Sequence, residues 1–164
     1  MSARSKRKES STSGANRTIA TNRKARFDYY IMDTMEAGLV LTGTEIKSLR
    51  AGRANIADAY ARPQDGELWL HNAHIAPYPQ GGIYNHEPTR PRKLLLHKDQ
   101  LAHLASEAGE KGLTIVPLRM YIKGHYAKVE VGLAKGKRQY DKRRTLIDRE
   151  KDQEARRALR QASR

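Results

Sequence analysis

A series of short segments in which apolar and polar residues alternate restricts the fold more than any other feature. Between Ala127 and Leu133 the odd-numbered residues are apolar and the even-numbered ones are charged or glycine, which is the period of a strand with one buried face. Residues 113–134 form two such strands hinged at Lys123-Gly124, and an Asp65-Gly66 pair predicts a second hairpin. Residues 27–43 are interpreted as a strand pair bent near Glu36, Ala37 and Gly38.

Helices are predicted only in the connections between these strands. Thr42 and Glu45 have the spacing of a capping box and predict a short helix. Apolar residues at i, i+3, i+4 and i+7 from Leu101 predict an amphipathic helix that ends at Gly109 or Gly112. A mainly β fold with short helices follows, and we predict a closed antiparallel OB-like β-barrel of about six strands because closure removes exposed edges.

Charge divides the chain into three parts. Of the formal net charge of +14, residues 1–26 carry +7 and residues 135–164 carry +7, while residues 27–134 are neutral. Cationic ends on a neutral body are typical of a polyanion binder, and the alternative is a pair of solvated tails. We predict a disordered basic N-terminal arm over 1–18, the barrel over 19–134 and a basic C-terminal tail over 135–164.

The tail has little apolar surface with which to hold a helix. Its apolar stripe comprises Ile147, Ala155, Ala158, Leu159 and Ala162. Such a stripe is too thin to stabilise a long helix in water without a partner, and each oppositely charged i, i+4 pair adds only about 0.2 to 0.5 kcal/mol. We expect the tail to be mostly disordered when free and to become a helix on its partner.

Several classes of protein are excluded or disfavoured by what the sequence lacks. The absence of cysteine excludes disulfides and Cys-ligated metal sites. His71 and His74 lie three apart on a predicted strand and face opposite sides, so no metal site is predicted. No P-loop, nucleophile motif or dinucleotide fingerprint occurs, so no catalytic residue and no cofactor is predicted. With no long apolar run and no signal segment, we expect a soluble cytoplasmic protein with no membrane contact.

The segment TRPRKLLLHK, residues 89–98, has the composition of a nucleic-acid contact. Its cations Arg90, Arg92 and Lys93 are expected to lie on a phosphate backbone. Alternation directs Leu94 and Leu96 into the core and leaves Leu95 and His97 outward, where they can pack on an RNA base or ribose. Further stacking candidates in the loops and tail are Tyr78, Tyr84 and Tyr140.

Five segments in this order make the chain resemble the small protein B (SmpB) family, the SsrA-binding proteins of bacteria. They are NRKARFDYYI, EAGLVLTGTEIKSLRAGRANIADAYA, NHEPTRPRKLLLHK, KGLTIVPLRMYIK and LAKGKRQYDKR, within residues 22–143. The resemblance implies an OB-like barrel that binds the tRNA-like domain of transfer-messenger RNA (SsrA RNA) and delivers it to stalled ribosomes. There the complex resumes synthesis by trans-translation and tags the nascent peptide for proteolysis.

The resemblance also implies partners and site residues. The implied partners are transfer-messenger RNA, the ribosome with its small-subunit decoding RNA and message channel, and elongation factor Tu reached through the RNA, with the protein itself a monomer. The RNA-contacting positions of the family fall on Glu36 in the E-A-G motif and on Leu95 and His97 after K-L-L-L. The residues implied for the decoding centre and message channel, where the tail is helical, are Gly136, Lys137, Arg138, Tyr140, Asp141, Lys142 and Arg143. Tyr140 stands where some members have His.

Three alternatives remain open at this level. Glu36 can serve as a salt bridge within the barrel instead of an RNA contact. The chain can be a ribosomal structural protein that holds rRNA with its basic ends. It can also be an RNA-modifying or RNA-cleaving enzyme that uses Asp28, Glu36 or His97.

Overall fold

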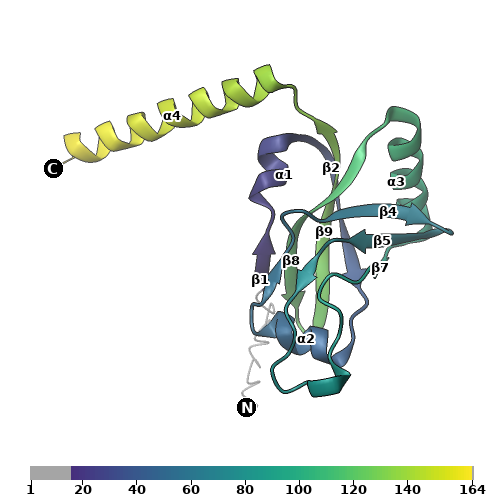
Figure 1. Ribbon diagram of the computed structural model, residues 1–164. Coiled ribbons are helices and arrows are strands. Elements are labelled where there is room, and N and C mark those ends of the chain that lie inside the picture. The colour runs from purple at the N-terminus through teal and green to yellow at the C-terminus, as the bar shows by residue number, and fades with distance from the viewer. Residues whose placement is uncertain (1–15, 164) are drawn as a thin grey trace, which may run out of the picture.

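A single antiparallel sheet of seven strands forms the body of the molecule in the computed structural model, which describes residues 16–163 (Figure 1). Its strands are β1 (Arg17–Thr21), β2 (Tyr29–Leu39), β4 (Tyr60–Gln64), β5 (Glu67–His71), β7 (Arg92–Leu95), β8 (Thr114–Lys123) and β9 (Tyr126–Gly136). The order is β1-β8-β4-β5-β7-β2-β9, and β8 also pairs with β9. A separate pair comprises β3 (Ala54–Asn55) and β6 (His74–Ile75). The protein is therefore mainly β.

Helices occupy the connections and the C-terminal end. They are α1 (Arg23–Asp28), α2 (Gly43–Arg50), the 3₁₀ turn η1 (Gly82–Tyr84), α3 (Lys98–Lys111) and α4 (Gln139–Ala162). The predicted helices α2 and α3 are confirmed: Glu45 accepts a hydrogen bond from the Thr42 backbone N–H at 3.2 Å, and Gly112 ends α3 with φ of 62°. In residues 16–163 no helix is both long and apolar enough to cross a membrane.

Both predicted hairpins are present. Asp65 and Gly66 turn β4 into β5 with φ of 52° and 72°, and Gly124 turns β8 into β9 with φ of 61°. These left-handed conformations favour glycine because it has no Cβ to clash with the backbone. Each hairpin therefore follows from local sequence.

The predicted bend at residues 36–38 is wrong. β2 is one continuous strand that pairs with β9 from Tyr29 opposite Gly136 to Gly38 opposite Lys128. Residues 36–38 stay extended along β9, and from Gly38 the strand also pairs with β7. The preceding residues form α1, which Asn22 caps by accepting a hydrogen bond from the Ala25 N–H at 2.9 Å.

The inner face of the sheet holds most of the apolar core. Alternate residues of β8 and β9 point inward with those of β5 and β7, and α3 adds Leu104 at 1% exposure. Fully buried side chains of the core include Leu68, Leu70, Ile115, Met120, Val129 and Val131. Because these residues come from strands far apart in the sequence, the core closes only when the whole sheet is assembled.

The ends of the body differ from the predicted boundaries. β1 begins at Arg17, so the boundary at residue 18 falls inside a strand, and residues 1–15 of the predicted arm lie outside the described residues. β9 continues to Gly136, and Ala134 is 1% exposed in a small cluster with Ala25 and Val116. The C-terminal boundary thus moves from residue 134 to residue 136.

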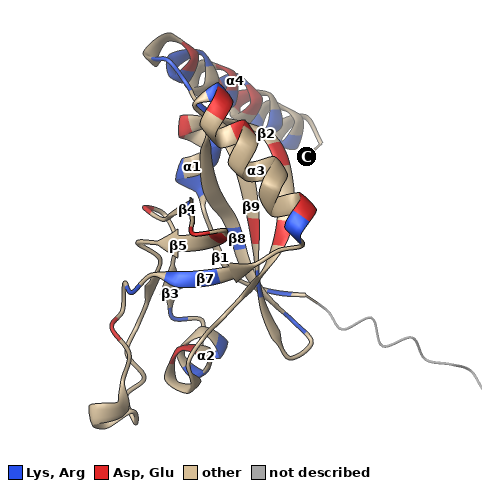
Figure 2. Ribbon diagram, turned by 90° about the vertical axis from the view of Figure 1, so that its right-hand side faces the viewer, with Lys and Arg blue, Asp and Glu red and all other residues tan. Residues whose placement is uncertain are grey.

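The tail is a helix in this structure, and its disorder in the free protein stays a prediction. α4 leaves the body at the end of β9 and extends into solvent (Figure 1). None of its side chains is buried. Along its length Lys and Arg are interspersed with Asp and Glu (Figure 2).

Candidate nucleic-acid interface

A groove lies where three separate parts of the chain meet at one end of the sheet. Its volume is about 560 Å³. It is lined by Glu36, Gly38 and Leu39 of β2, by Leu95, Leu96, His97 and Gln100 around the end of β7 and the start of α3, and by Tyr126, Ala127 and Lys128 of β9. The groove therefore brings together Glu36, Leu95 and His97, the three residues that the resemblance implied for RNA contact.

Leu95 forms an apolar wall of this groove because of strand alternation and a neighbouring glycine. In β7, Leu94 is 3% exposed while Leu95 is 52% exposed, as predicted. Gly38 lies opposite Leu95 in the β2–β7 register. A Cβ at Gly38 would lie only 3.2 Å from the Leu95 Cβ, so glycine lets the leucine lie flat across β2.

His97 occupies the position before the first residue of α3. Its backbone N–H donates to the Gln100 side chain at 3.3 Å, and its carbonyl accepts from the Leu101 N–H at 3.0 Å. These backbone bonds fix the residue while its side chain stays exposed. The imidazole is therefore free to act as a donor or an acceptor at the groove.

Glu36 lies within a network of donors. The Tyr121 hydroxyl donates to its carboxylate, and the ammonium groups of Lys123 and Lys128 lie 3.6 and 3.7 Å from Oε1. The hydrogen bond from Tyr121, assisted by the two lysines, lowers the pKa of Glu36 below its ordinary value. Burial and the Glu36 carboxylate raise the pKa of Tyr121. Glu36 is thus an ionised acceptor, and it also forms the ion pairs within the body that its alternative role requires.

The basic residues of 89–98 do not form the predicted phosphate-binding row. Arg92 is completely buried, where its guanidinium pairs with the carboxylate of Glu45, so the prediction for Arg92 is wrong. Arg90 donates to the same carboxylate and keeps 30% of its side chain exposed. Lys93 pairs with Glu67 on the surface. The alternation that puts Leu94 inward also puts Arg92 inward, since the two residues share one face of β7.

Sequence reasoning missed two cationic or aromatic residues of the groove. Tyr126 is 73% exposed at the start of β9, and Lys128 follows it on the same face. The alternation in residues 127–133 could have identified both residues, because it places even-numbered side chains on the face opposite the buried ones. The two loop tyrosines lie elsewhere: Tyr78 is half-buried with the Lys47 ammonium 5.4 Å from its ring centroid, and Tyr84 is exposed on η1.

The predicted tail residues lie at the other end of β9. A second hollow of about 490 Å³ is lined by Tyr30, Lys135, Gly136, Arg138, Tyr140 and Asp141. Tyr140 is 74% exposed, so its ring is available for stacking. Partial burial and the nearby Asp141 carboxylate raise the pKa of the Tyr30 hydroxyl. The groove and this hollow are thus separated by the length of one strand.

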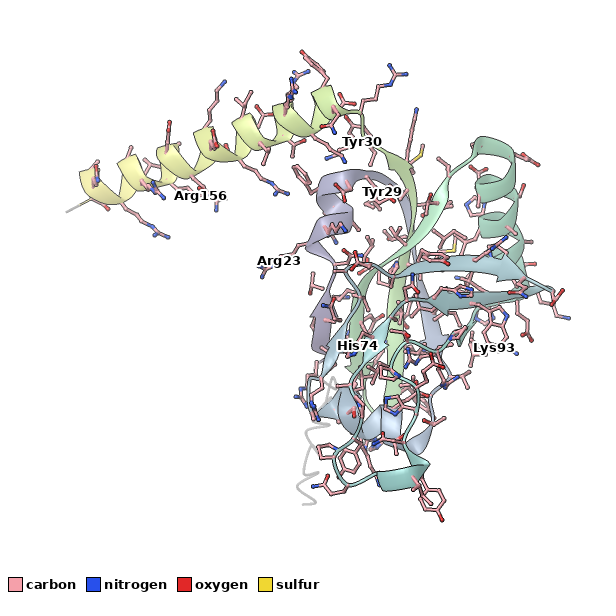
Figure 3. The ribbon with its side chains drawn as sticks, viewed as in Figure 1. Arg23, Tyr29, Tyr30, His74, Lys93 and Arg156 are labelled. Atoms are coloured by element: carbon pink, nitrogen blue, oxygen red, sulfur yellow. The ribbon has the colours of Figure 1, made fainter. Side chains whose placement is uncertain are left out.

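Two cations of the tail motif already have partners in the body. Lys142 forms an ion pair with Asp28, and Lys137 lies over the ring of Tyr30. Arg143 is exposed on α4. Figure 3 shows Tyr30 where α4 leaves the body, with Arg156 far along the helix.

In residues 16–163 no group of three His, Asp or Glu side chains is arranged to hold a metal ion.

Comparison with known proteins places these features in a family. The model of the family described as SmpB protein matches residues 19–161. The SsrA-binding protein of Desulforudis audaxviator is 57% identical over 144 residues, covering 88% of this chain and 94% of that protein. The SsrA-binding protein of Enterococcus faecalis is 58% identical over 146 residues, covering 89% and 95%.

One solved structure is also similar. It is described as "tmRNA-SmpB: a journey to the center of the bacterial ribosome". Its matching chain is 50% identical, has a TM-score of 0.63, and the match covers 77% of this chain and 92% of that one. At this identity the likeness extends beyond the fold to the sequence.

Proposed function

Because the chain belongs to the SmpB family, we propose that it binds transfer-messenger RNA and acts with that RNA on the ribosome in trans-translation. The relatives are SsrA-binding proteins, and the similar solved structure is of tmRNA-SmpB in the bacterial ribosome. The activity is delivery of the RNA to stalled ribosomes, so that the nascent peptide is tagged for proteolysis. It requires binding and positioning, with no chemical step by this chain.

The body acts as an OB-like barrel in this proposal. Hydrogen-bonded pairing runs from β8 through β4, β5, β7, β2 and β9, and the additional β8–β9 pairing returns to the starting strand. Six strands paired in such a ring support closure into a barrel, with β1 added outside on β8. The groove is lined by β7, β2 and β9 together because these three strands are consecutive neighbours in the sheet.

The groove binds the tRNA-like domain. The observation that carries this assignment is the convergence of Glu36, Leu95 and His97 on one groove from separate elements. Glu36 accepts hydrogen bonds from base amino groups or 2′-hydroxyls, Leu95 packs against a base or ribose, and His97 adds a hydrogen bond. Lys123 and Lys128 lie beside Glu36 and attract the phosphates.

The tail acts in the decoding centre and the vacant message channel. Gly136 ends β9, and in α4, which follows, Lys and Arg outnumber Asp and Glu. In the channel, Lys137, Arg138, Lys142 and Arg143 contact phosphates, Tyr140 stacks on the decoding RNA, and Asp141 accepts a hydrogen bond. A helix with no buried side chain is suited to this role because all of its faces remain free for RNA.

Binding of the purified protein to the tRNA-like domain, titrated at fixed salt, tests the groove. We expect Leu95→Ala to weaken binding about 4- to 13-fold, because covering the exposed half of a leucine side chain contributes about 0.8 to 1.5 kcal/mol. The matched control is Met32→Ala, which removes an apolar side chain that is 61% exposed on β2 and does not line the groove. Glu36→Gln should weaken binding as well. Equal affinity of the Leu95 variant and the control would reject the groove as the RNA site.

Truncation tests the division between body and tail. Because β9 continues to Gly136 and the Lys137 N–H donates to the Asp28 carbonyl at 2.9 Å, the cut belongs after Lys137. The shortened protein should keep most of its affinity for the tRNA-like domain and lose peptide tagging in a reconstituted assay with stalled ribosomes. Normal tagging by the shortened protein would refute the role of the tail.

A further inference from the structure

In the free protein the first turn of α4 is attached to the body by contacts that hold Lys137 and Lys142, two of the cations that the proposed function places on phosphates once the tail is in the channel. The Lys142 Nζ lies 3.2 Å from the Asp28 Oδ1, and the two side chains are only 28% and 23% exposed. One turn earlier, the Lys137 N–H donates to the Asp28 carbonyl at 2.9 Å. Asp28 therefore holds the tail through both its side chain and its backbone.

Neighbouring side chains extend the same contact. The Lys137 ammonium lies 5.0 Å from the ring centroid of Tyr30 and 3.5 Å from the Thr145 hydroxyl. Further along α4, the Arg149 guanidinium lies 5.7 Å from the ring centroid of Phe27. We name the body side of this contact, formed by Phe27, Asp28 and Tyr30 at the junction of α1 and β2, the tail joint.

Beyond the tail joint nothing else in the described residues holds the helix. From residue 146 to residue 163 every side chain is exposed. At 1.5 Å per residue, the 24 residues of α4 span about 36 Å. A rotation of about 10° at the tail joint would move the far end by roughly 6 Å, which exceeds the rise of one helical turn. The direction of the tail thus depends on these few contacts.

We propose that the tail joint sets the direction in which α4 leaves the body, and that Asp28 is its main positioning residue. This inference rests on the proposed function, because the direction matters when the tail enters the message channel while the body holds the RNA. A preset direction aids entry because the chain does not have to lose orientational freedom on the ribosome. Asp28 acts through Lys142 and Lys137 and does not itself contact the ribosome.

The direction can be measured in the free protein. Because the chain has no cysteine, spin labels can be attached at single introduced sites, Ala102→Cys in α3 and Ala155→Cys in α4. The labelled protein should give a narrow distribution of distances, and Asp28→Asn should broaden it. The matched control is Asp58→Asn, the same substitution at an aspartate that pairs with Lys24 of α1 and does not contact α4. A distribution as narrow in Asp28→Asn as in the control would overturn the proposal.

Function provides the second readout. Asp28→Asn should lower the tagging rate about 3- to 10-fold and leave affinity for the tRNA-like domain unchanged, because the groove lies at the other end of β9. Faster tagging would overturn the proposal, since it would make the contact a restraint on entry. Lost RNA affinity would overturn it too, by assigning Asp28 to the structure of the body.

Exchanging the charges of Asp28 and Lys142 tests whether the ion pair itself, rather than a neighbouring contact, sets the direction of α4. Lys142→Asp and Asp28→Lys should each broaden the distance distribution, and the double exchange should narrow it again. A double exchange as broad as either single variant would refute the pairing. If the unmodified protein bound no transfer-messenger RNA, the proposed function would fail, while the distance distributions would still test the tail joint.

Discussion

The buried ion pair between Glu45 and Arg92 gives a sharp prediction about stability. Both side chains have no exposed surface, and Arg90 donates to the same carboxylate from the edge. Arg92 also donates to the carbonyl oxygens of Ala73 at 2.6 Å and Pro88 at 2.9 Å. The guanidinium thus joins β7 to the loop before it. Glu45 joins α2 to that loop through Arg90 and to β7 through Arg92.

Replacement of Glu45 by Gln keeps the size of the side chain and removes its charge. The buried Arg92 guanidinium then lacks its counter-charge, and breaking a buried pair in this way costs about 3 to 5 kcal/mol. For a chain of this length each kcal/mol lowers Tm by roughly 2 to 4 °C, so we expect a loss on the order of 10 °C. The assay is thermal and urea unfolding monitored by circular dichroism.

Low pH should weaken the same ion pair and so lower the stability of the fold. Burial acts to raise the pKa of Glu45, but hydrogen bonds from Arg92 and Arg90 outweigh it and hold the pKa below the ordinary 4.5. A lowered pKa in the folded state means that the stabilisation is complete above the unfolded value and is lost as pH falls through the folded value. The stability of the unmodified protein should therefore fall more steeply below about pH 4 than that of Glu45→Gln.

The matched control is Glu67→Gln, the same substitution at a carboxylate that pairs with Lys93 on the surface with 39% of its side chain exposed. We expect this control to change stability by less than about 1 kcal/mol. A loss of the same size in both variants, or an acid dependence as steep in Glu45→Gln as in the unmodified protein, would refute the argument that burial makes the Glu45–Arg92 pair important.

Three further predictions concern the groove and the tail. Tyr121→Phe removes the donor that contributes most to the low pKa of Glu36, so that pKa should rise in an NMR titration of the side-chain carboxyl; an unchanged value would exclude the hydrogen bond. Gly38→Ala puts a methyl group 3.2 Å from the Leu95 Cβ and should displace that side chain, which lowers affinity for the tRNA-like domain at least several-fold while the body stays folded; unchanged affinity would show that the site tolerates the shift. Backbone amides of residues 150–162 should exchange with solvent far faster than those of β8 and β9, because no tertiary contact protects them; equal protection measured by hydrogen exchange would mean that the outer helix is held.

Local sequence determined those features that depend on neighbours along the chain. The Asp65-Gly66 and Lys123-Gly124 hairpins, the ends of α2 and α3, and the outward position of Leu95 all follow from turn chemistry, capping and alternation. The ordered motifs also carried the resemblance to the family, to which the chain belongs. The contributions of the groove residues to RNA binding, and those of the tail residues to the ribosome, stay predictions.

Tertiary structure decided the features that depend on pairing between distant segments. Residues 36–38 look like a bend in the sequence, but pairing with β9 holds them extended, and β7 joins on the other side at Gly38. Arg92 has the composition of a phosphate contact, yet Glu45, 47 residues earlier, makes its burial possible. Asp28 meets Lys142 only because β9 brings the start of α4 beside α1. No local pattern encodes these contacts, since strand order and register arise from the cooperative assembly of the whole sheet.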